Sequence, residues 1–220
     1  MIHIDRLTKR FGSRVVLREL CLQVPAGEHV AIRGPSGSGK TTLLRLIAGL
    51  EAPDEGRILL GGELASDPEW QRPPDRRELG FVFQRAALWP HITVAQNIRF
   101  GIMGLSPNMT RVRLDRLLAE LDIASLRNCH PHRLSGGEAR RVALARSLAP
   151  QPRRLLLDEP LTHLDDRLRD QVLTVVLEQV RQTQATLVVV THDAHEAEQL
   201  ATQQWLLRDG ALVDAAEACP

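Results

Sequence analysis

Apolar residues follow two different spacings along this chain of 220 residues. Ile2 and Ile4 alternate with polar neighbours, residues 11–13 have the composition of a turn, and residues 15–24 are mostly extended in pattern. This part predicts a small antiparallel sheet. Leu- and Val-rich runs at 154–157 and 186–191 are typical of parallel strands covered on both faces. Further strands are expected at 29–33, 57–60 and, as a second buried strand, 79–84.

Helical spacing separates these strands. Helices are predicted at 41–50 and 194–201, with a longer amphipathic helix at 166–182. A hairpin around Asp209-Gly210 follows, with strands at 205–207 and 211–213. Residues 67–77 are polar, contain prolines and are expected to be irregular.

The region from 95 to 148 is helical in its period and carries two apolar faces. The first consists of Val112, Leu114, Leu117, Leu118 and Leu121, and the second of Val142, Leu144 and Leu148. We therefore expect an α/β core that contains an inserted helical subdomain at 85–152. The core would be formed by residues 1–84 and 153–220, within one domain spanning 1–220.

Composition narrows the classes of function. A hydrophobic content of 43% supports a globular core. The chain has 28 Lys and Arg against 27 Asp and Glu, which gives a formal charge of +1. No strong net charge would attract nucleic acid, so nucleic acid is not expected as a partner. Cys21, Cys129 and Cys219 lack a CxxC spacing and predict unpaired thiols in a reducing cytoplasm. The N-terminus is charged where a signal peptide is apolar, so we do not expect secretion. No run of about 18 apolar residues occurs, so we do not expect a membrane span.

One glycine-rich segment predicts phosphate binding. It matches GxxxxGK[ST] between a predicted strand and a predicted helix, and consists of Gly34, Pro35, Ser36, Gly37, Ser38, Gly39, Lys40 and Thr41. Backbone N–H groups of such a loop surround phosphate oxygens, and the helix N-terminus adds a positive dipole. Lys40 is expected to contact the β and γ phosphates, and the Thr41 hydroxyl is expected to ligate Mg²⁺.

Two carboxylates follow a buried strand. Asp158 and Glu159 end the run at 153–157, at the sheet edge where α/β proteins bind ligands. Asp158 is the expected partner of Mg²⁺, and Glu159 is the expected base for an attacking water. A solvated Asp-Glu turn is the alternative that the phosphate loop disfavours.

Two further side chains are weaker candidates. His192 follows the strand at 186–191 and is placed for a γ-phosphate contact, although a histidine after a strand is often incidental. Gln84 ends the strand at 79–83 and is a candidate for the metal or its water.

The segment Leu134, Ser135, Gly136, Gly137 and Glu138 has two compatible interpretations. Ser135 and Glu138 have the spacing of a capping box that opens a helix at 139–148. A glycine-flanked helix start with a serine hydroxyl is also an anion site. Which phosphate it serves is left open by these residues alone.

Together these motifs resemble the ATP-binding cassette (ABC) family over nearly the whole chain. Six elements occur in the family's order: the phosphate loop 34–41, the Q-loop Gln84, the signature 134–138, Asp158-Glu159, the D-loop-like 161–165 and His192. The resemblance implies an α/β fold with a P-loop NTPase (RecA-like) core, an N-terminal antiparallel β subdomain and an inserted α-helical subdomain. It also implies that Phe11 stacks on adenine, that Thr42 joins the ATP site, and that Asp165 belongs to the D-loop.

The same resemblance implies a dimer and a transport partner. Two cassettes pair head to tail, as a homodimer or a mixed pair, so that each ATP lies between one phosphate loop and the partner's signature. Lys40, Glu159 and His192 would carry hydrolysis. Residues 72–77 and 81–94 look like ATPase subunits of bacterial importers for sugars, polyamines, metals or oxyanions. Leu88 and Trp89 would then face an integral membrane permease at the cytoplasmic face of the inner membrane, together with a solute-binding protein.

The sequence departs from the family pattern at some positions, and functions other than transport stand as alternatives. Glu138 replaces the family's commoner Gln, His163 stands where a small residue is common, and the chain ends soon after Val213, without the regulatory domain of many such importers. A soluble cassette ATPase acting in DNA repair, translation or iron-sulfur assembly is the alternative function. A small-molecule P-loop kinase has no use for the signature, and an inactive cassette is disfavoured because the catalytic set is complete.

Overall fold

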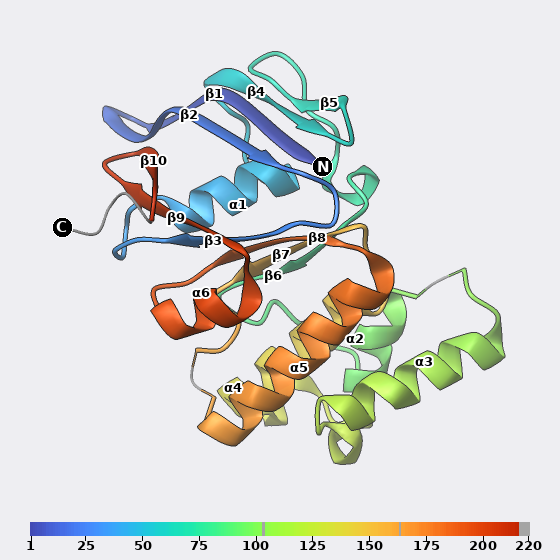
Figure 1. Cartoon of the computed structure of the whole chain (residues 1–220). Coiled ribbons are helices and arrows are strands. Elements are labelled where there is room, and N and C mark those ends of the chain that lie inside the picture. Colours follow the sequence, from blue (N-terminus) through green and yellow to red (C-terminus); the bar gives the residue numbers. More distant parts are fainter. Residues whose placement is uncertain (103, 163, 216–220) are drawn as a thin grey trace.

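Two sheets enclose one helix, and the remaining helices cover the opposite face of the larger sheet (Figure 1). The structure, a computed structural model, describes residues 1–102, 104–162 and 164–215. His163 and Cys219 therefore lie outside the described residues, whereas Cys21 and Cys129 carry free thiols. No helix of the described ranges is long and apolar enough to cross a membrane.

The smaller sheet is antiparallel, with strand order β2-β1-β4-β5. Its strands are β1 (Ile2–Phe11), β2 (Arg14–Val24), β4 (Glu55–Leu60) and β5 (Glu63–Ser66). The predicted N-terminal sheet is thereby confirmed, and the strand expected at 57–60 begins two residues earlier. No element was predicted at β5, whose four residues follow a glycine turn within a polar stretch.

The larger sheet has six strands in the order β10-β9-β3-β8-β7-β6. They are β3 (His29–Arg33), β6 (Leu79–Val82), β7 (Arg154–Asp158), β8 (Thr186–Val190), β9 (Gln203–Arg208) and β10 (Ala211–Asp214). All neighbours pair in parallel except the β9–β10 hairpin. Every residue of β7 and β8 is buried, as predicted for strands covered on both faces.

Strand β6 differs from its prediction. It ends at Val82, so Gln84 lies in the bend that follows rather than at the end of the strand. It is also an edge strand with β7 as its one neighbour in the sheet. Its burial alternates because Leu79 and Phe81, on one face, are only partly covered by the core around α1, whereas Gly80 and Val82 on the other face are buried.

Six α-helices are described. They are α1 (Lys40–Ala48), α2 (Val94–Phe100), α3 (Pro107–Glu120), α4 (Gly136–Leu148), α5 (Asp166–Thr183) and α6 (Ala194–Leu200), with 3₁₀ turns η1 (Pro74–Arg76), η2 (Ala124–Leu126) and η3 (Pro131–Arg133). The apolar face of α3 is narrower than predicted: Leu114, Leu117 and Leu118 are buried, but Val112 is 58% exposed. Val112 was therefore wrongly assigned to that face.

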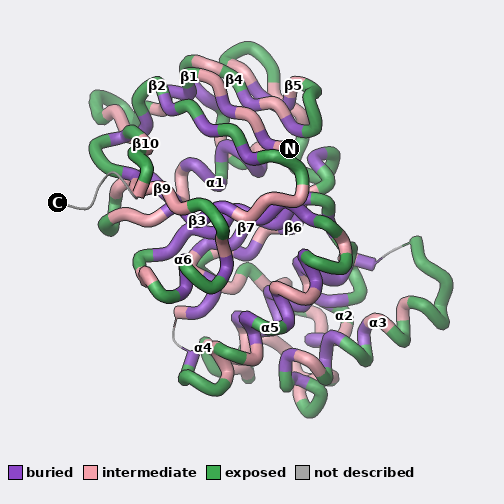
Figure 2. Tube along the Cα trace, in the orientation of Figure 1, coloured by how far each residue is buried: buried purple, intermediate pink, exposed green. Residues whose placement is uncertain are grey.

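Two cores result, one on each face of the larger sheet (Figure 2). The first joins the two sheets through α1, with Leu43, Leu44 and Ile47 fully buried. The second joins the sheet to the helices, including residues of α2, α3 and α4. The inserted helices thus share their core with β7 and β8 instead of forming one of their own.

Arg77 links α1 to the smaller sheet although it is completely buried. Its guanidinium donates five hydrogen bonds, to the carbonyls of Arg72 (2.8 Å), Leu46 (3.2 Å), Ile47 (2.9 Å) and Ala65 (2.8 Å) and to Ser66 Oγ (2.6 Å). Two of these acceptors lie in the last turn of α1. Burial lowers the pKa of Arg77 to about 10, with Arg72 adding to that shift.

Replacing Arg77 should destabilise the fold. Arg77→Met leaves four buried acceptors and one partly buried acceptor without this donor, and we expect the free energy of unfolding in urea to fall by about 4 kcal/mol. Arg57→Met is the control, because Arg57 is largely exposed and pairs with Asp5 at the surface. That change should cost less than about 1 kcal/mol. Equal losses in the two variants would contradict the role given to Arg77.

Candidate functional site

The glycine loop connects β3 to α1 through residues 34–39. At two positions of the loop only glycine fits, because neighbouring atoms lie too close for a side chain. A Cβ on Gly34 would lie 2.5 Å from the Leu207 carbonyl oxygen, and one on Gly39 would lie 2.9 Å from Val16 Cγ1. Both residues have positive φ, a conformation that side chains disfavour. Neighbouring strands therefore hold this loop in its shape at the start of α1.

Lys40 begins α1 and is 6% exposed. Its ammonium donates to the carbonyls of Gly34 (2.7 Å) and Pro35 (2.9 Å), which keeps it against the loop. An ammonium has three N–H donors, so these two bonds leave one for a phosphate. Burial lowers the pKa of Lys40, and the carboxylates of Glu159 and Asp158 oppose that shift.

Asp158 ends β7 beside the start of α1. The Thr41 hydroxyl donates to Asp158 Oδ1 at 3.2 Å, and the residue Asp158 is 2% exposed. Burial raises the pKa of Asp158, which the bond from Thr41 opposes. A hydroxyl and a carboxylate in contact next to a phosphate loop are the hard oxygen donors that Mg²⁺ takes, so these two residues fit that ion.

Glu159 and His192 meet just beyond the ends of β7 and β8. Glu159 has a left-handed backbone (φ 48°), and its N–H donates to the Val190 carbonyl at 2.9 Å. Its Oε1 lies 3.4 Å from His192 Nδ1, and its Oε2 lies 3.5 Å from the Thr162 hydroxyl. The Glu159 side chain is 15% exposed and that of His192 is 63% exposed. The carboxylate is thus partly enclosed, with the imidazole on its solvent side.

One pocket of about 420 Å³ gathers most of the predicted site. Its lining consists of Phe11, Arg14, Val16, Ser36, Gly37, Gly39, Lys40, Thr41, Thr42, Gln84 and Glu159. Phe11 is 48% exposed at its edge.

Arg14 and Val16 were missed by the sequence analysis. The Arg14 guanidinium donates to the Gly37 carbonyl at 3.2 Å, and Val16 packs against Gly39. The available signal was their position on the strand directly after the Phe11 turn.

The signature segment does not line that pocket in the described chain. Ser135 caps α4, and the capping box is confirmed in both directions: Ser135 Oγ accepts from the Glu138 N–H (3.3 Å), and Glu138 Oε2 accepts from the Ser135 N–H (2.7 Å). The latter bond lowers the pKa of Glu138. The carboxylate is therefore held at the cap.

Asp165 and the segment after Gln84 have local partners. The Asp165 carboxylate caps α5 by accepting from the Leu168 N–H at 3.0 Å. Leu88 is half-buried against the helical core. Trp89 packs against Phe100 with ring centroids 4.2 Å apart, and the Arg146 guanidinium lies 5.0 Å from its ring. These contacts leave the partner-facing roles of the three residues as predictions.

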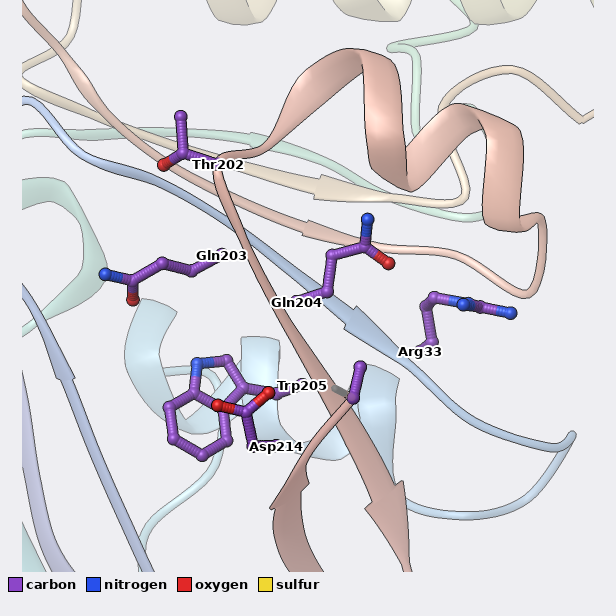
Figure 3. A pocket seen from close by; sticks show the side chains of 7 residues that line it. Arg33, Thr202, Gln203, Gln204, Trp205 and Asp214 are labelled. Carbon is purple, nitrogen blue, oxygen red and sulfur yellow. The ribbon is translucent and has the colours of Figure 1, made fainter. Parts of the chain in front are cut away.

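A larger hollow of about 610 Å³ lies elsewhere, around β9 and the end of β3 (Figure 3). It is lined by Arg33, Thr202, Gln203, Gln204, Trp205, Asp214 and Ala215. None of the catalytic candidates contributes to this lining. The volume of a hollow therefore does not identify the functional site here. The candidate functional site is the smaller phosphate-loop pocket, because it contains the catalytic candidates.

A phosphate loop between β3 and α1, with carboxylates at the end of the parallel strand β7, defines a P-loop nucleotide-binding fold. The family model for ABC transporters matches residues 17–162. The chain belongs to the ABC transporter family, and that prediction from the motifs is confirmed.

Relatives and solved structures agree. The chain is 44% identical over 218 residues to the Fe(3+) ions import ATP-binding protein FbpC of Pseudomonas fluorescens, covering 97% of this chain and 60% of that protein. It is 43% identical over 219 residues to the probable sulfate/thiosulfate import ATP-binding protein CysA of Chlorella vulgaris, covering 99% and 91%. The dimeric, ADP- and Pi-bound structure of the ATP-binding cassette MJ0796 superposes with a TM-score of 0.86 at 31% identity, covering 96% of each chain. The chain therefore spans about 60% of the length of FbpC.

A buried carboxyl interacts with Thr191 and His192, next to the candidate site. Glu196 on α6 is 5% exposed, and one of its oxygens accepts from the Thr191 hydroxyl at 2.6 Å. Burial raises the pKa of Glu196 to about 7; Asp193 adds to the shift, whereas Thr191, Arg169 and His192 oppose it. Glu196 also attracts the guanidinium of Arg140.

Glu196 should make stability depend on pH. The folded chain keeps a proton on this carboxyl between the ordinary pKa of 4.5 and about 7, where the unfolded chain has released it. The free energy of unfolding should therefore fall as pH rises through that window, by roughly 3 kcal/mol at most, and be level above it. Urea unfolding of wild type and Glu196→Gln, compared above and below the window, measures this contribution. Glu198→Gln, exposed on the same helix, is the control. If the free energies of unfolding of wild type and Glu196→Gln differed by the same amount at every pH, the proposed contribution of Glu196 would be excluded.

Proposed function

We propose that this chain is the ATP-hydrolysing subunit of an ABC transporter. The observation that carries the proposal is one pocket in which the phosphate loop, Lys40 and Glu159 meet, next to the contact between Thr41 and Asp158. The pocket has the chemistry to bind a nucleoside triphosphate. Backbone N–H groups and an ammonium would bind the phosphates, oxygen ligands would bind a metal, and the ring of Phe11 would stack on the base.

The residues divide the work of hydrolysis. Lys40 and the loop amides bind the phosphates and offset their negative charge. Thr41 and Asp158 would hold Mg²⁺, with Gln84 as a further candidate, and the bound ion supplies Lewis-acid stabilisation of phosphate oxygens. Glu159 would orient a water and accept its proton, and His192, 3.4 Å from that carboxylate, would contact the γ-phosphate.

The working unit in this proposal is a dimer. The signature residues lie outside the phosphate-loop pocket, and a Cβ on Gly136 would meet nothing within 4 Å, so the start of α4 is open. The structural relative MJ0796 is dimeric. ATP held between the loop of one copy and the signature of its partner satisfies both observations, and Asp165 would lie near that contact.

The proposed task is solute import through a separate permease, as the names of the relatives FbpC and CysA state for those proteins. The chain would then act as a peripheral subunit at the cytoplasmic face of the cell membrane, with a solute-binding protein delivering the solute. Residues 1–220 would form one cassette, with 85–152 as its helical part.

The permease surface would lie on that helical part. Exposed apolar side chains gather there: Phe100, Leu105, Met109 and Val112. An adjacent apolar hollow of about 430 Å³ is lined by residues of α2 and α3 and their connection. Trp89 borders Phe100, which supports its predicted role, whereas the partly buried Leu88 would act mainly by packing.

Removing the proposed base tests the function. Glu159→Gln keeps the size of the side chain but cannot take a proton, so we expect turnover to fall below a hundredth of the wild-type rate. ATP should still bind, and the variant should elute as an ATP-dependent dimer in gel filtration. Glu198→Gln is the matched control for loss of a carboxyl. Normal hydrolysis by Glu159→Gln would show that the catalytic assignment is wrong.

A further inference from the structure

Arg140 lies inside the molecule although it is charged. It is on α4, two residues after Glu138, and is 9% exposed. Its guanidinium donates through Nη1 to the carbonyl of Glu159 and through Nη2 to the carbonyl of Gln84, the latter at 2.5 Å. One side chain thus joins the helix that starts at the signature to two segments of the nucleotide pocket.

Two paired strands lead into these segments, and their pairing ends before the segments begin. Gln84 follows β6, at the edge of the sheet, and Glu159 follows β7, whereas the last paired residues are Val82 and Leu157. They are 56 and 19 residues from Arg140 along the chain. Because a guanidinium is planar and rigid, two bonds from its two terminal nitrogens fix the spacing of the two carbonyls.

The Glu159 backbone needs such support. Its left-handed conformation is unfavourable for a residue with a side chain, so neighbouring groups must stabilise it. Its N–H is held by the Val190 carbonyl, and its carbonyl by Arg140 and by the Thr162 hydroxyl at 3.1 Å. The direction of the Glu159 carboxylate follows from this backbone, and so does its approach to a water.

Charge acts in the same sense. The carboxylates of Glu159, Glu196 and Asp158 all attract the Arg140 guanidinium, and they oppose the lowering of its pKa by burial. A cation among these acidic groups reduces the repulsion between those that are ionised. Loss of Arg140 would therefore both release the carbonyls and remove one of the cations that offset the charge of these carboxylates.

We infer that Arg140 is a positioning residue for hydrolysis, which ties Glu159 and Gln84 to the signature helix of the same chain. Arg140 has no proposed contact with ATP and acts through the backbones of Glu159 and Gln84. A displacement of α4 by a partner would thereby move Glu159. The inference rests on the proposed ATPase function and adds a residue outside the family motifs identified in the sequence.

The experiment compares Arg140→Met with Arg113→Met. Arg113 also binds two main-chain carbonyls, of Leu148 (2.8 Å) and Ala149, but at the far end of α4. Both variants lose two carbonyl bonds from a buried or half-buried arginine. Arg140→Lys keeps the charge but cannot bridge two carbonyls with a planar fork, so it should recover only part of the activity.

Two readouts are required. We expect kcat of Arg140→Met to fall about ten- to a hundred-fold with KM for ATP within about two-fold, because the base is misplaced while the phosphate loop is intact. In the nucleotide-free protein, amide hydrogen exchange should accelerate at 84–88 and at 159–162 in Arg140→Met. Arg113→Met should change neither, whatever its effect on thermal stability.

The outcomes separate the inference from the proposed function. Wild-type kcat in Arg140→Met, unchanged exchange at both segments, or an equal loss of kcat in Arg113→Met would each overturn the positioning role. A wild-type protein that does not hydrolyse ATP would instead refute the proposed function, while the exchange comparison would still test the link between α4 and Glu159.

Discussion

The parallel pairing of β3, β8, β7 and β6 is the constraint on which the rest of the molecule depends. Parallel strands end at one edge of their sheet, so the phosphate loop, His192, Asp158-Glu159 and Gln84 follow strands that point the same way. In the register of the sheet, Val190 of β8 lies between Asp158 of β7 on one side and Ile32 of β3 on the other. A slip of one residue in β7 or β8 would exchange side chains between the two cores, so the packing of the Leu and Val side chains sets the heights of the functional groups.

Much of this arrangement could be predicted from local pattern. The strand at 29–33, the helix beginning at Asp166 and the capping box of Ser135 and Glu138 are encoded by neighbouring residues, and they were predicted correctly. Val112 was not, because a helical period identifies an apolar stripe but not how far the neighbouring core extends. The same limit applies to Gln84, whose strand is shortened at the sheet edge.

Long-range contacts were beyond the sequence analysis. Arg14, Val16 and Arg140 act through residues that are distant along the chain: Gly37, Gly39, Gln84 and Glu159. The sequence of a helix does not show which distant carbonyls an arginine on it will contact. With Arg140 in place, α4 carries the proposed partner-facing signature at its start and a tie to the proposed base in its second turn. The dimer contact and the hydrolysis would thus depend on one rigid element.

The central claim is that each complete site is formed by two copies of the chain. Lys40→Met disables the loop, and Gly136→Asp places a negative charge at the open start of α4, where it has room and suits the helix dipole. Each variant alone should be inactive as a homodimer. Mixed in equal amounts, half of the dimers pair an intact loop with an intact signature, and ATPase activity should return to about a quarter of the wild-type rate. A mixture no more active than the two variants measured separately would contradict the claim.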